Sequence, residues 1–84
     1  MKNDKDAFSK ADAVGRLTAR EKEVFHMLLK GMKAKEIAAA NAISIWGANY
    51  FTKQVYRKLK VRSKVELVLR YIEFGQAEKK ENKD

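Results

Sequence analysis

The residues best suited to binding chemistry lie between positions 44 and 64, where large aromatic side chains are followed by a run of cations. The segment SIWGANYF at 44–51 places Trp46, Tyr50 and Phe51 around a glycine and an asparagine. A local basic patch is typical of a surface that contacts a polyanion, although a solvated lysine-rich face has the same composition. The basic residues of this patch, which follow one another with no acidic residue between them, are Lys53, Arg57, Lys58, Lys60, Arg62 and Lys64.

The net charge of +8 belongs to the middle of the chain. Acidic and basic residues balance within residues 1–15 and again within residues 76–84, so the excess positive charge lies in residues 16–75. Both ends are highly charged and poor in large apolar residues, which is typical of flexible segments. We therefore expect a charged flexible N-terminal tail at 1–15, one ordered domain at 16–75 and a charged C-terminal tail at 76–84.

The composition excludes several classes of protein. A chain of 84 residues has room for one small domain and none for a separate catalytic domain. It contains no cysteine and one histidine, so we expect no disulfide, no metal site and no cofactor. His26, with Glu23 one turn away, is more typical of a helix surface than of a general base, and we do not expect an enzyme. No apolar run approaches the roughly 20 residues that a membrane span needs, and we expect a cytoplasmic protein.

The elements that must position the aromatic and basic residues are helices, because the chain has no proline and no alternating apolar pattern. Thr18 and Glu21 form a capping box at the start of one helix, and Gly31 ends it. Ser44 is the expected N-cap of another helix, and a second capping box begins at Ser63. We expect an all-α fold, a small four-helix domain whose helices lie at about 19–30, 34–40, 45–59 and 63–74.

The second and third of these helices are separated by only about four residues, NAIS. A short helix, a tight turn and a longer basic helix are the parts of a helix-turn-helix, in which the first helix braces the second and the second enters the major groove of DNA. Other small helical bundles have the same layout. The helix-turn-helix is therefore a prediction that the arrangement of side chains must support.

The expected helix at 45–59 has two contrasting faces. At about 100° per residue, an apolar stripe for the core is formed by Ala48, Phe51, Val55 and Leu59. The opposite, outward side carries Trp46, Asn49, Tyr50, Lys53 and Arg57. Large aromatic side chains on a solvent-facing surface usually indicate a contact. Trp46 has a second possible place, folded back over the turn as a lid on the core, whereas Tyr50 is expected to be exposed.

Three stretches of the chain resemble a known family. The segments LTAREKEVFHMLLKGMKAKEIA, IS and VYRKLKVRSKVELV are similar to the LuxR/GerE-type helix-turn-helix domain of bacterial transcription regulators, over about Leu17 to Ile72. Residues at the spacing of that family, without a gap, are Leu17, Thr18, Arg20, Glu21, Glu23, Val24, Gly31, Lys35, Glu36, Ile37, Ala38, Ile43, Ser44, Lys58, Leu59, Val61 and Val68.

The resemblance implies a four-helix domain that binds double-stranded DNA, with a recognition helix at 45–59. By position, it implies base contacts at Asn49, Tyr50 and Lys53. It also implies contacts to the DNA backbone near Lys35 and Lys58, to which we add Trp46 and Arg57 from the outward face.

The resemblance further implies that such domains often dimerise through the last helix. In that helix Val65, Leu69 and Ile72 recur at i, i+4 and i+7 and could form the contact. The stripe is modest, so we expect the free domain to be mainly monomeric or a weak homodimer.

The chain departs from the family pattern at the beginning of the recognition helix. Relatives usually carry Thr-Val-Lys-x-His where this chain reads GANYF at 47–51, and a leucine where it has Asn41. Asn49 replaces a lysine and could pair bidentately with adenine, so sequence preference should differ from that of typical relatives. Asn41 either caps its helix in a left-handed conformation, which we expect, or leaves a polar group in the core.

Two functions remain open at this point. The first is a DNA-binding transcription regulator, or the output domain of one, that inserts helix 45–59 into the major groove. The alternative is a LuxR-like helical domain whose altered recognition helix serves as a protein-interaction module. Binding through several phosphates must weaken steeply as salt rises, whereas an aromatic protein interface need not.

Overall fold

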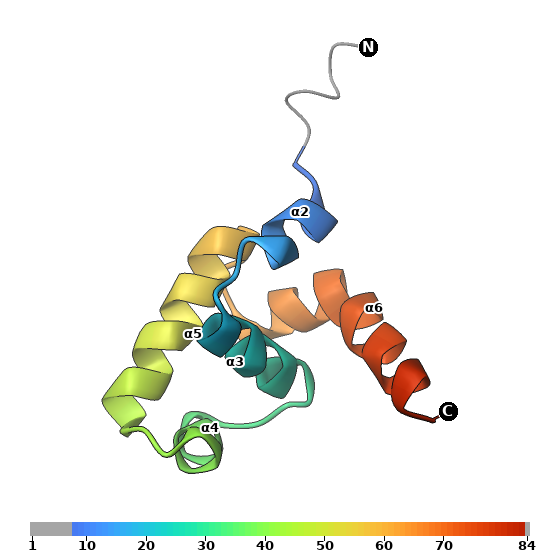
Figure 1. Ribbon diagram of the computed structural model, residues 1–84. Helices are drawn as coiled ribbons and strands as arrows, with labels where there is room; N and C mark the ends of the chain where they lie inside the picture. The colour runs from blue at the N-terminus through green and yellow to red at the C-terminus, as the bar shows by residue number, and fades with distance from the viewer. Residues whose placement is uncertain (1–7, 84) are drawn as a thin grey trace, which may run out of the picture.

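The computed structural model describes the backbone of residues 8–83 and the side chains of residues 8–75, and within this range the chain forms helices and no strand (Figure 1). The expected all-α fold is confirmed. The helices are α2 (Lys10–Gly15), α3 (Ala19–Leu29), α4 (Ala34–Asn41), α5 (Ile45–Leu59) and α6 (Lys64–Lys83). None of the helices in the described part of the chain is long and apolar enough to cross a membrane.

Helix α3 lies at the centre of the fold and packs against both α5 and α6, while α4 and α2 each pack against α5 (Figure 1). The interior is apolar except for Glu21, and Tyr71 of α6 is its largest fully buried side chain. Its hydroxyl donates a hydrogen bond to the carbonyl of Leu59 at 2.8 Å, so the end of α5 is tied to the middle of α6. The buried apolar side chains are Ala13, Leu17, Val24, Phe25, Leu28, Ile37, Ala38, Ala48, Val55, Leu59, Val61, Leu67 and Tyr71.

The first capping box begins α3 as expected. The Thr18 hydroxyl accepts a hydrogen bond from the Glu21 amide at 3.2 Å, and the Glu21 carboxylate accepts one from the Thr18 amide at 3.0 Å. Gly31, with φ of 85°, follows the end of the helix in the left-handed conformation that glycine adopts without strain. This confirms the predicted start and stop of the first long helix.

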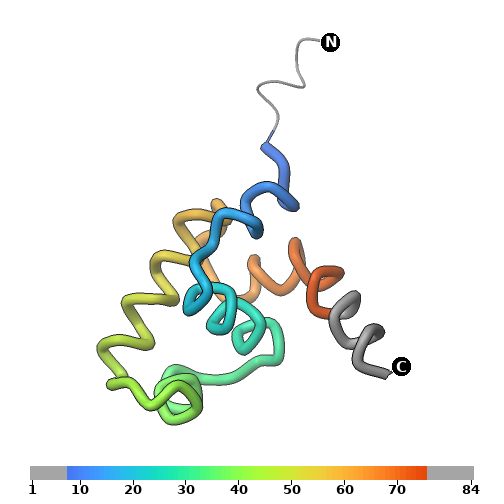
Figure 2. Tube along the Cα trace, viewed as in Figure 1, coloured from blue at the N-terminus to red at the C-terminus, as the bar shows by residue number. Residues whose placement is uncertain are grey.

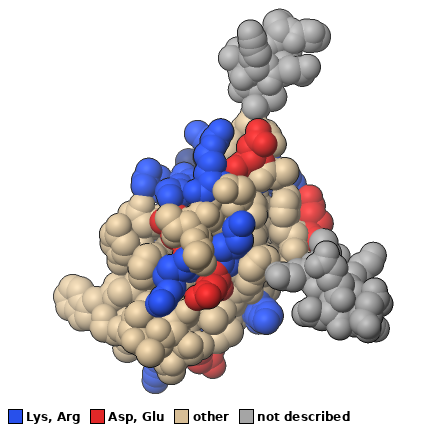
Figure 3. All heavy atoms as spheres, viewed as in Figure 1, with Lys and Arg blue, Asp and Glu red and all other residues tan. Residues whose placement is uncertain are grey.

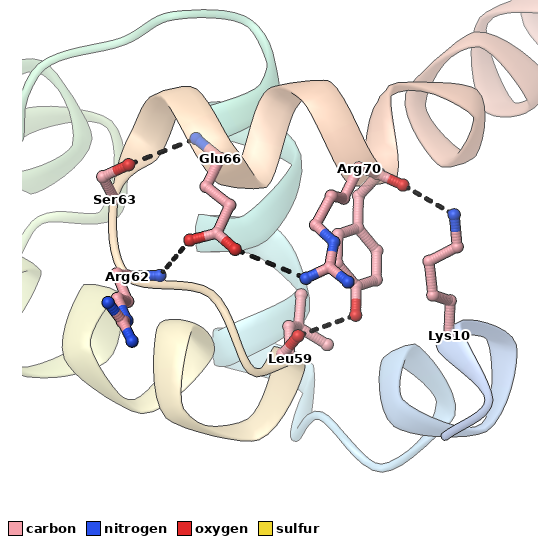
Figure 4. Close-up of polar contacts among 7 residues, drawn as sticks. Lys10, Leu59, Arg62, Ser63, Glu66 and Arg70 are labelled. Carbon is pink, nitrogen blue, oxygen red and sulfur yellow. Dashed lines mark hydrogen bonds and ion pairs between the residues drawn. The ribbon is translucent and has the colours of Figure 1, made fainter. Parts of the chain in front are cut away.

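The second capping box is shifted by one residue. The Ser63 hydroxyl accepts a hydrogen bond from the Glu66 amide at 3.2 Å, but the Glu66 carboxylate accepts from the amide of Arg62, at 2.9 Å (Figure 4). The same carboxylate pairs with Arg70 one turn later at 3.3 Å. Glu66 therefore links the loop before α6 to the second turn of the helix.

The predicted flexible N-terminal tail is wrong for residues 10–15, which form α2. Ser9 caps this helix by accepting a hydrogen bond from the Asp12 amide, and Ala13 is buried in the core. Lys10 donates a hydrogen bond to the Arg70 carbonyl at 2.9 Å, which joins α2 to α6 (Figure 4). The tail was predicted from the balance of charged residues, and that balance gives no information about small apolar residues such as Ala13, which this helix buries. Residues 1–7 lie outside the described part of the chain.

The predicted end of the last helix before Gly75 is also wrong, because α6 continues to Lys83. A side chain at Gly75 would place its Cβ 3.1 Å from the Leu29 Cδ1 atom of α3. Gly75 therefore allows the two helices to approach closely instead of ending α6. The side chains of residues 76–83 and the whole of residue 84 lie outside the described part, so the domain boundary at 75 remains a prediction.

Candidate nucleic-acid interface

A tight turn joins α4 to α5 and holds the two helices together (Figure 2). Ala42 adopts the left-handed conformation with φ of 56°, and the Ile43 amide donates a hydrogen bond to the Ala38 carbonyl at 3.0 Å. Ser44 then caps α5 by accepting a hydrogen bond from the Gly47 amide at 3.0 Å. The short helix, the turn and the longer helix confirm the expected helix-turn-helix.

Asn41 does not take the left-handed position that was expected for it. It is the last residue of α4, and its side-chain amide donates hydrogen bonds to the Ile37 carbonyl at 2.9 Å and to the Met27 sulfur at 3.4 Å. The following residue, Ala42, makes the left-handed turn instead. Asn41 is half-buried. Its amide nitrogen is nevertheless satisfied, because it donates to the carbonyl one turn back in its own helix.

The apolar stripe of α5 faces the core as predicted. Ala48, Val55 and Leu59 are completely buried, and Phe51 is half-buried against the same cluster. This fixes the rotation of the helix about its axis, since these residues come from four successive turns. The opposite side of α5 must therefore face solvent.

The aromatic residues of α5 confirm that orientation. The Trp46 side chain is 85% exposed and that of Tyr50 is 57% exposed, so the alternative in which Trp46 covers the core is wrong. The Tyr50 ring contacts the Phe51 ring edge to face, with centroids 5.2 Å apart. Phe51 therefore restrains an exposed ring that would otherwise be free to rotate.

The polar and basic side chains predicted for the outward face are exposed as well. Asn49, Lys53 and Arg57 are all accessible, and Lys35 is exposed near the start of α4. Among the described side chains, no ion pair involves Lys53 or Arg57, although Arg57 donates a hydrogen bond to Gln54. These cations are available to a negatively charged partner.

Charge is unevenly distributed along α5. In Figure 3 the surface over the start of α5, at the lower left, is uncharged, whereas Lys and Arg atoms gather at the upper left, where α5 ends. The sequence agrees, because residues 45–52 carry no charged side chain and Lys53 is the first cation. The outward face thus combines an uncharged first half with a basic second half.

Lys58 has a different environment from the other cations of α5. Its ammonium group contacts a Glu21 carboxylate oxygen at 2.8 Å, and the Glu21 side chain is only 7% exposed. Burial acts to raise the pKa of Glu21, but the hydrogen bonds from Lys58 and Thr18 outweigh it and hold that pKa below its ordinary value. The interaction joins α5 to α3, which gives Lys58 a structural role that the sequence did not indicate.

Ile45 is a surface residue that the sequence analysis did not select. Its side chain is 49% exposed and directly precedes Trp46. On a helix it lies about 60° from Ala48 of the buried stripe, at the border of the core face. The angle between Ile45 and the buried stripe is the feature of the sequence from which its partial exposure could have been predicted.

Helix α6 has an exposed apolar stripe at the expected positions. Val65 is 69% exposed, Leu69 is 75% exposed and Ile72 is 37% exposed, whereas Leu67 and Tyr71 point into the core. The proposed use of this stripe for dimerisation stays a prediction.

The described part of the chain contains no group of three or more His, Cys, Asp or Glu side chains arranged to hold a metal ion.

Comparison with protein families identifies the helix-turn-helix. The model of the family described as "Bacterial regulatory proteins, luxR family" (GerE) matches residues 15–71, which is more than half of the 84-residue chain. Comparison with curated proteins and with solved structures gives no match. The matched range contains α3, α4, α5 and the first part of α6. The chain therefore belongs to the luxR family of bacterial regulatory proteins, whose helix-turn-helix domains bind DNA and regulate transcription.

Proposed function

We propose that this protein is a transcription regulator, or the output domain of one, that inserts α5 into the major groove of double-stranded DNA. The observation that carries the proposal is the outward face of α5, where Asn49, Tyr50 and Lys53 are exposed opposite the buried stripe. From Asn49 to Arg57 this face extends about 12 Å along the helix. A major groove about 12 Å wide accommodates a helix of this kind.

The exposed residues divide into two kinds of contact. Asn49, Tyr50 and Lys53 are proposed to contact base edges, with the Asn49 amide able to pair with both N6 and N7 of adenine. Arg57 and Lys35 are proposed to contact phosphates, because their charges are exposed on the two helices of the pair.

Lys58 is not part of this proposed contact set, although its position in the family implies one. Its ammonium group is already held by the buried carboxylate of Glu21. Moving it to a phosphate would leave that carboxylate without its cation, which is costly in a buried site. Trp46 carries no charge and is treated separately below.

The test of the proposal is selection of binding sites from random duplexes at two salt concentrations, followed by measurement on the enriched site. Because each phosphate contact releases counterions, the affinity should fall steeply as salt rises. Asn49→Ala should weaken the preferred site by about 1 to 3 kcal/mol and relax preference at one base pair, with little effect on scrambled duplexes. Arg57→Ala should weaken all duplexes alike and reduce the salt slope by about one.

A matched control is the exposed Lys22 of α3, which lies outside the helix pair. Lys22→Ala removes the same number of charges as Arg57→Ala and should leave the base preference unchanged and the salt slope almost unchanged. If Asn49→Ala and Lys53→Ala are folded and bind with unchanged affinity and preference, α5 does not read DNA. The exposed Trp46 would then favour the alternative, a protein-interaction surface on the same helix.

A further inference from the structure

Large exposed apolar side chains are concentrated at the beginning of α5. Ile45, Trp46 and Tyr50, which we call the apolar tip, all lie within the first six residues of the helix and are 49%, 85% and 57% exposed. Trp46 is the most exposed large hydrophobic residue in the described part of the chain. A concentration of this kind marks a contact surface.

Two residues of the apolar tip, Trp46 and Tyr50, lie on the same outward face as the proposed DNA contacts, while Ile45 lies at the border of the core face. Trp46 and Tyr50 are one turn apart, about 6 Å along the axis and about 40° around it. Asn49 lies next to them on the exposed side, and Lys53 begins the basic half of the helix. The neighbours of the tip are therefore an amide that can pair with a base, Asn49, and cations that can contact phosphates, Lys53 and Arg57. These neighbours favour DNA over an uncharged partner.

The tip itself has no means of holding a phosphate with a side-chain charge. Residues 45–52 contain neither a cation nor an anion, so the salt-dependent part of binding comes from cations outside this segment, among them Lys53, Arg57 and Lys35. What the tip offers is apolar area, and the ring of Tyr50 is restrained against Phe51 at 5.2 Å. This apolar area is best matched by an apolar group in the groove.

The major-groove edge of DNA presents hydrogen-bond donors and acceptors together with one apolar substituent, the C5-methyl group of thymine. We propose that the apolar tip reads 5-methyl groups of pyrimidines in the major groove, with Trp46 and Tyr50 as the principal contacts. The inference rests on the proposed insertion of α5 into that groove. It adds a second kind of base reading to that of Asn49, one that depends on methyl groups instead of hydrogen bonds.

The experiment uses a duplex enriched from a random pool and the same duplex with thymine replaced by uracil, which keeps the base-pairing groups and removes only the methyl. For the parent protein, the uracil duplex should bind about fourfold more weakly for each contacted methyl, the factor that corresponds to about 0.8 kcal/mol for one buried methylene-sized group. Placing a C·G pair at a contacted position, with cytosine and then with 5-methylcytosine, tests whether the methyl group itself is read, and the methylated duplex should bind more tightly. The salt slope should be the same on both duplexes, since no charge changes.

Two variants and one control assign the effect to the tip. In Trp46→Ala and Tyr50→Ala the difference between the thymine and uracil duplexes should shrink toward none. Trp46 is exposed, so its removal should leave the circular dichroism and the melting temperature almost unchanged. Phe8→Ala removes a 42% exposed aromatic side chain that precedes α2 and lies outside the apolar tip, and this variant should keep the full difference.

Fluorescence gives a direct reading, because Trp46 is the only tryptophan of the chain. Its emission should be quenched or shifted to shorter wavelength by the thymine duplex, and less so by the uracil duplex at equal occupancy.

The outcomes separate this inference from the proposed function. Salt-dependent binding with equal affinity for thymine and uracil duplexes, and unchanged Trp46 emission, would overturn methyl reading while the DNA-binding function stands. Absence of salt-dependent binding to any duplex would overturn the proposed function itself. An emission shift produced by a protein partner, with none produced by DNA, would assign the tip to protein contact and overturn the inference.

Discussion

Helices α5 and α6 both expose large apolar side chains, but the charges around those side chains differ. On α5, Trp46 is 85% exposed, and among the described side chains Lys53 and Arg57 have no ion-pair partner. On α6, Leu69 is 75% exposed, and neighbouring charges are already paired within the molecule. The pairs are Arg70 with Glu66 at 3.3 Å and Lys10 with Glu73 at 3.6 Å (Figure 4 shows the first).

Exposed apolar area does not by itself indicate a partner, whereas the charges around it do. A face with unpaired cations attracts a polyanion and repels a second copy of itself. A face whose charges are internally paired can meet its own copy across a two-fold axis without bringing like charges together. We therefore propose that α5 faces DNA and that α6 faces a second protomer, and the following predictions test that division.

The largest effect is expected from the α6 stripe on DNA with two half-sites. Leu69→Gln places a polar group in the proposed dimer contact without changing the net charge, and its exposure means that folding should not suffer. Loss of pairing should weaken binding to a duplex with two properly spaced half-sites by about a hundredfold, or roughly 2.7 kcal/mol. Titration of one-site and two-site duplexes, with sedimentation of each complex, measures the change.

Binding to a single half-site is the internal control, since it requires no second protomer. It should be the same for the parent and for Leu69→Gln. If the parent already binds both duplexes equally and sediments as one protein per duplex, α6 is not a dimerisation helix. The proposed division of roles between α5 and α6 is then wrong for α6.

The next effect distinguishes the cations of α5 from one another. Lys58→Met keeps the length of the side chain but leaves the Glu21 carboxylate, 7% exposed, without its cation, which should lower the free energy of unfolding by about 2 kcal/mol. Because Lys58 is not proposed to contact phosphate, the salt slope for DNA should change little. Urea denaturation and DNA titration of one preparation measure both quantities.

The same ion pair predicts a dependence of stability on pH. The pKa of Glu21 is lower in the folded protein than in the unfolded chain, so its contribution to stability is present above the unfolded pKa and is lost as pH falls through the folded pKa. Lys58→Met should reduce this acid-side loss, because it removes the hydrogen bond and the charge of Lys58 that lower the Glu21 pKa, while burial still acts to raise it. A variant that is as stable as the parent, but whose salt slope falls by about one, would show that Lys58 holds a phosphate after all.

Local signals predicted much of this fold. The capping box at Thr18 and the N-cap at Ser44 located the starts of α3 and α5, because both depend on hydrogen bonds within three residues. The apolar period of α5 then determined its rotation, and with it the exposure of Asn49, Tyr50 and Lys53. These outward residues could therefore be named before the structure was known.

What the sequence did not predict depends on contacts between distant residues. The ion pair of Lys58 was not predicted because its partner, Glu21, lies 37 residues away and no local pattern joins the two. The contact between α2 and α6 was not predicted because Lys10 finds its acceptor, the Arg70 carbonyl, 60 residues along the chain. The same limitation applies to Gly75, which resembles a helix stop until the proximity of Leu29 is known.

The smallest effect is expected from the two glycines that lie inside α5 and α6. At Gly47 an added Cβ would meet Ser44 and Ile43 atoms at 3.5 to 3.6 Å, which is ordinary van der Waals contact. Gly47→Ala should therefore raise the free energy of unfolding by about 0.5 to 1 kcal/mol, the difference in helix propensity between the two residues. At Gly75 the same gain is opposed by the Leu29 Cδ1 atom at 3.1 Å, which must move, so Gly75→Ala should stabilise less or not at all. Chemical denaturation of the two variants beside the parent measures the difference, and an equal or larger gain for Gly75→Ala would show that the contact between α3 and α6 is looser than the contact at the start of α5.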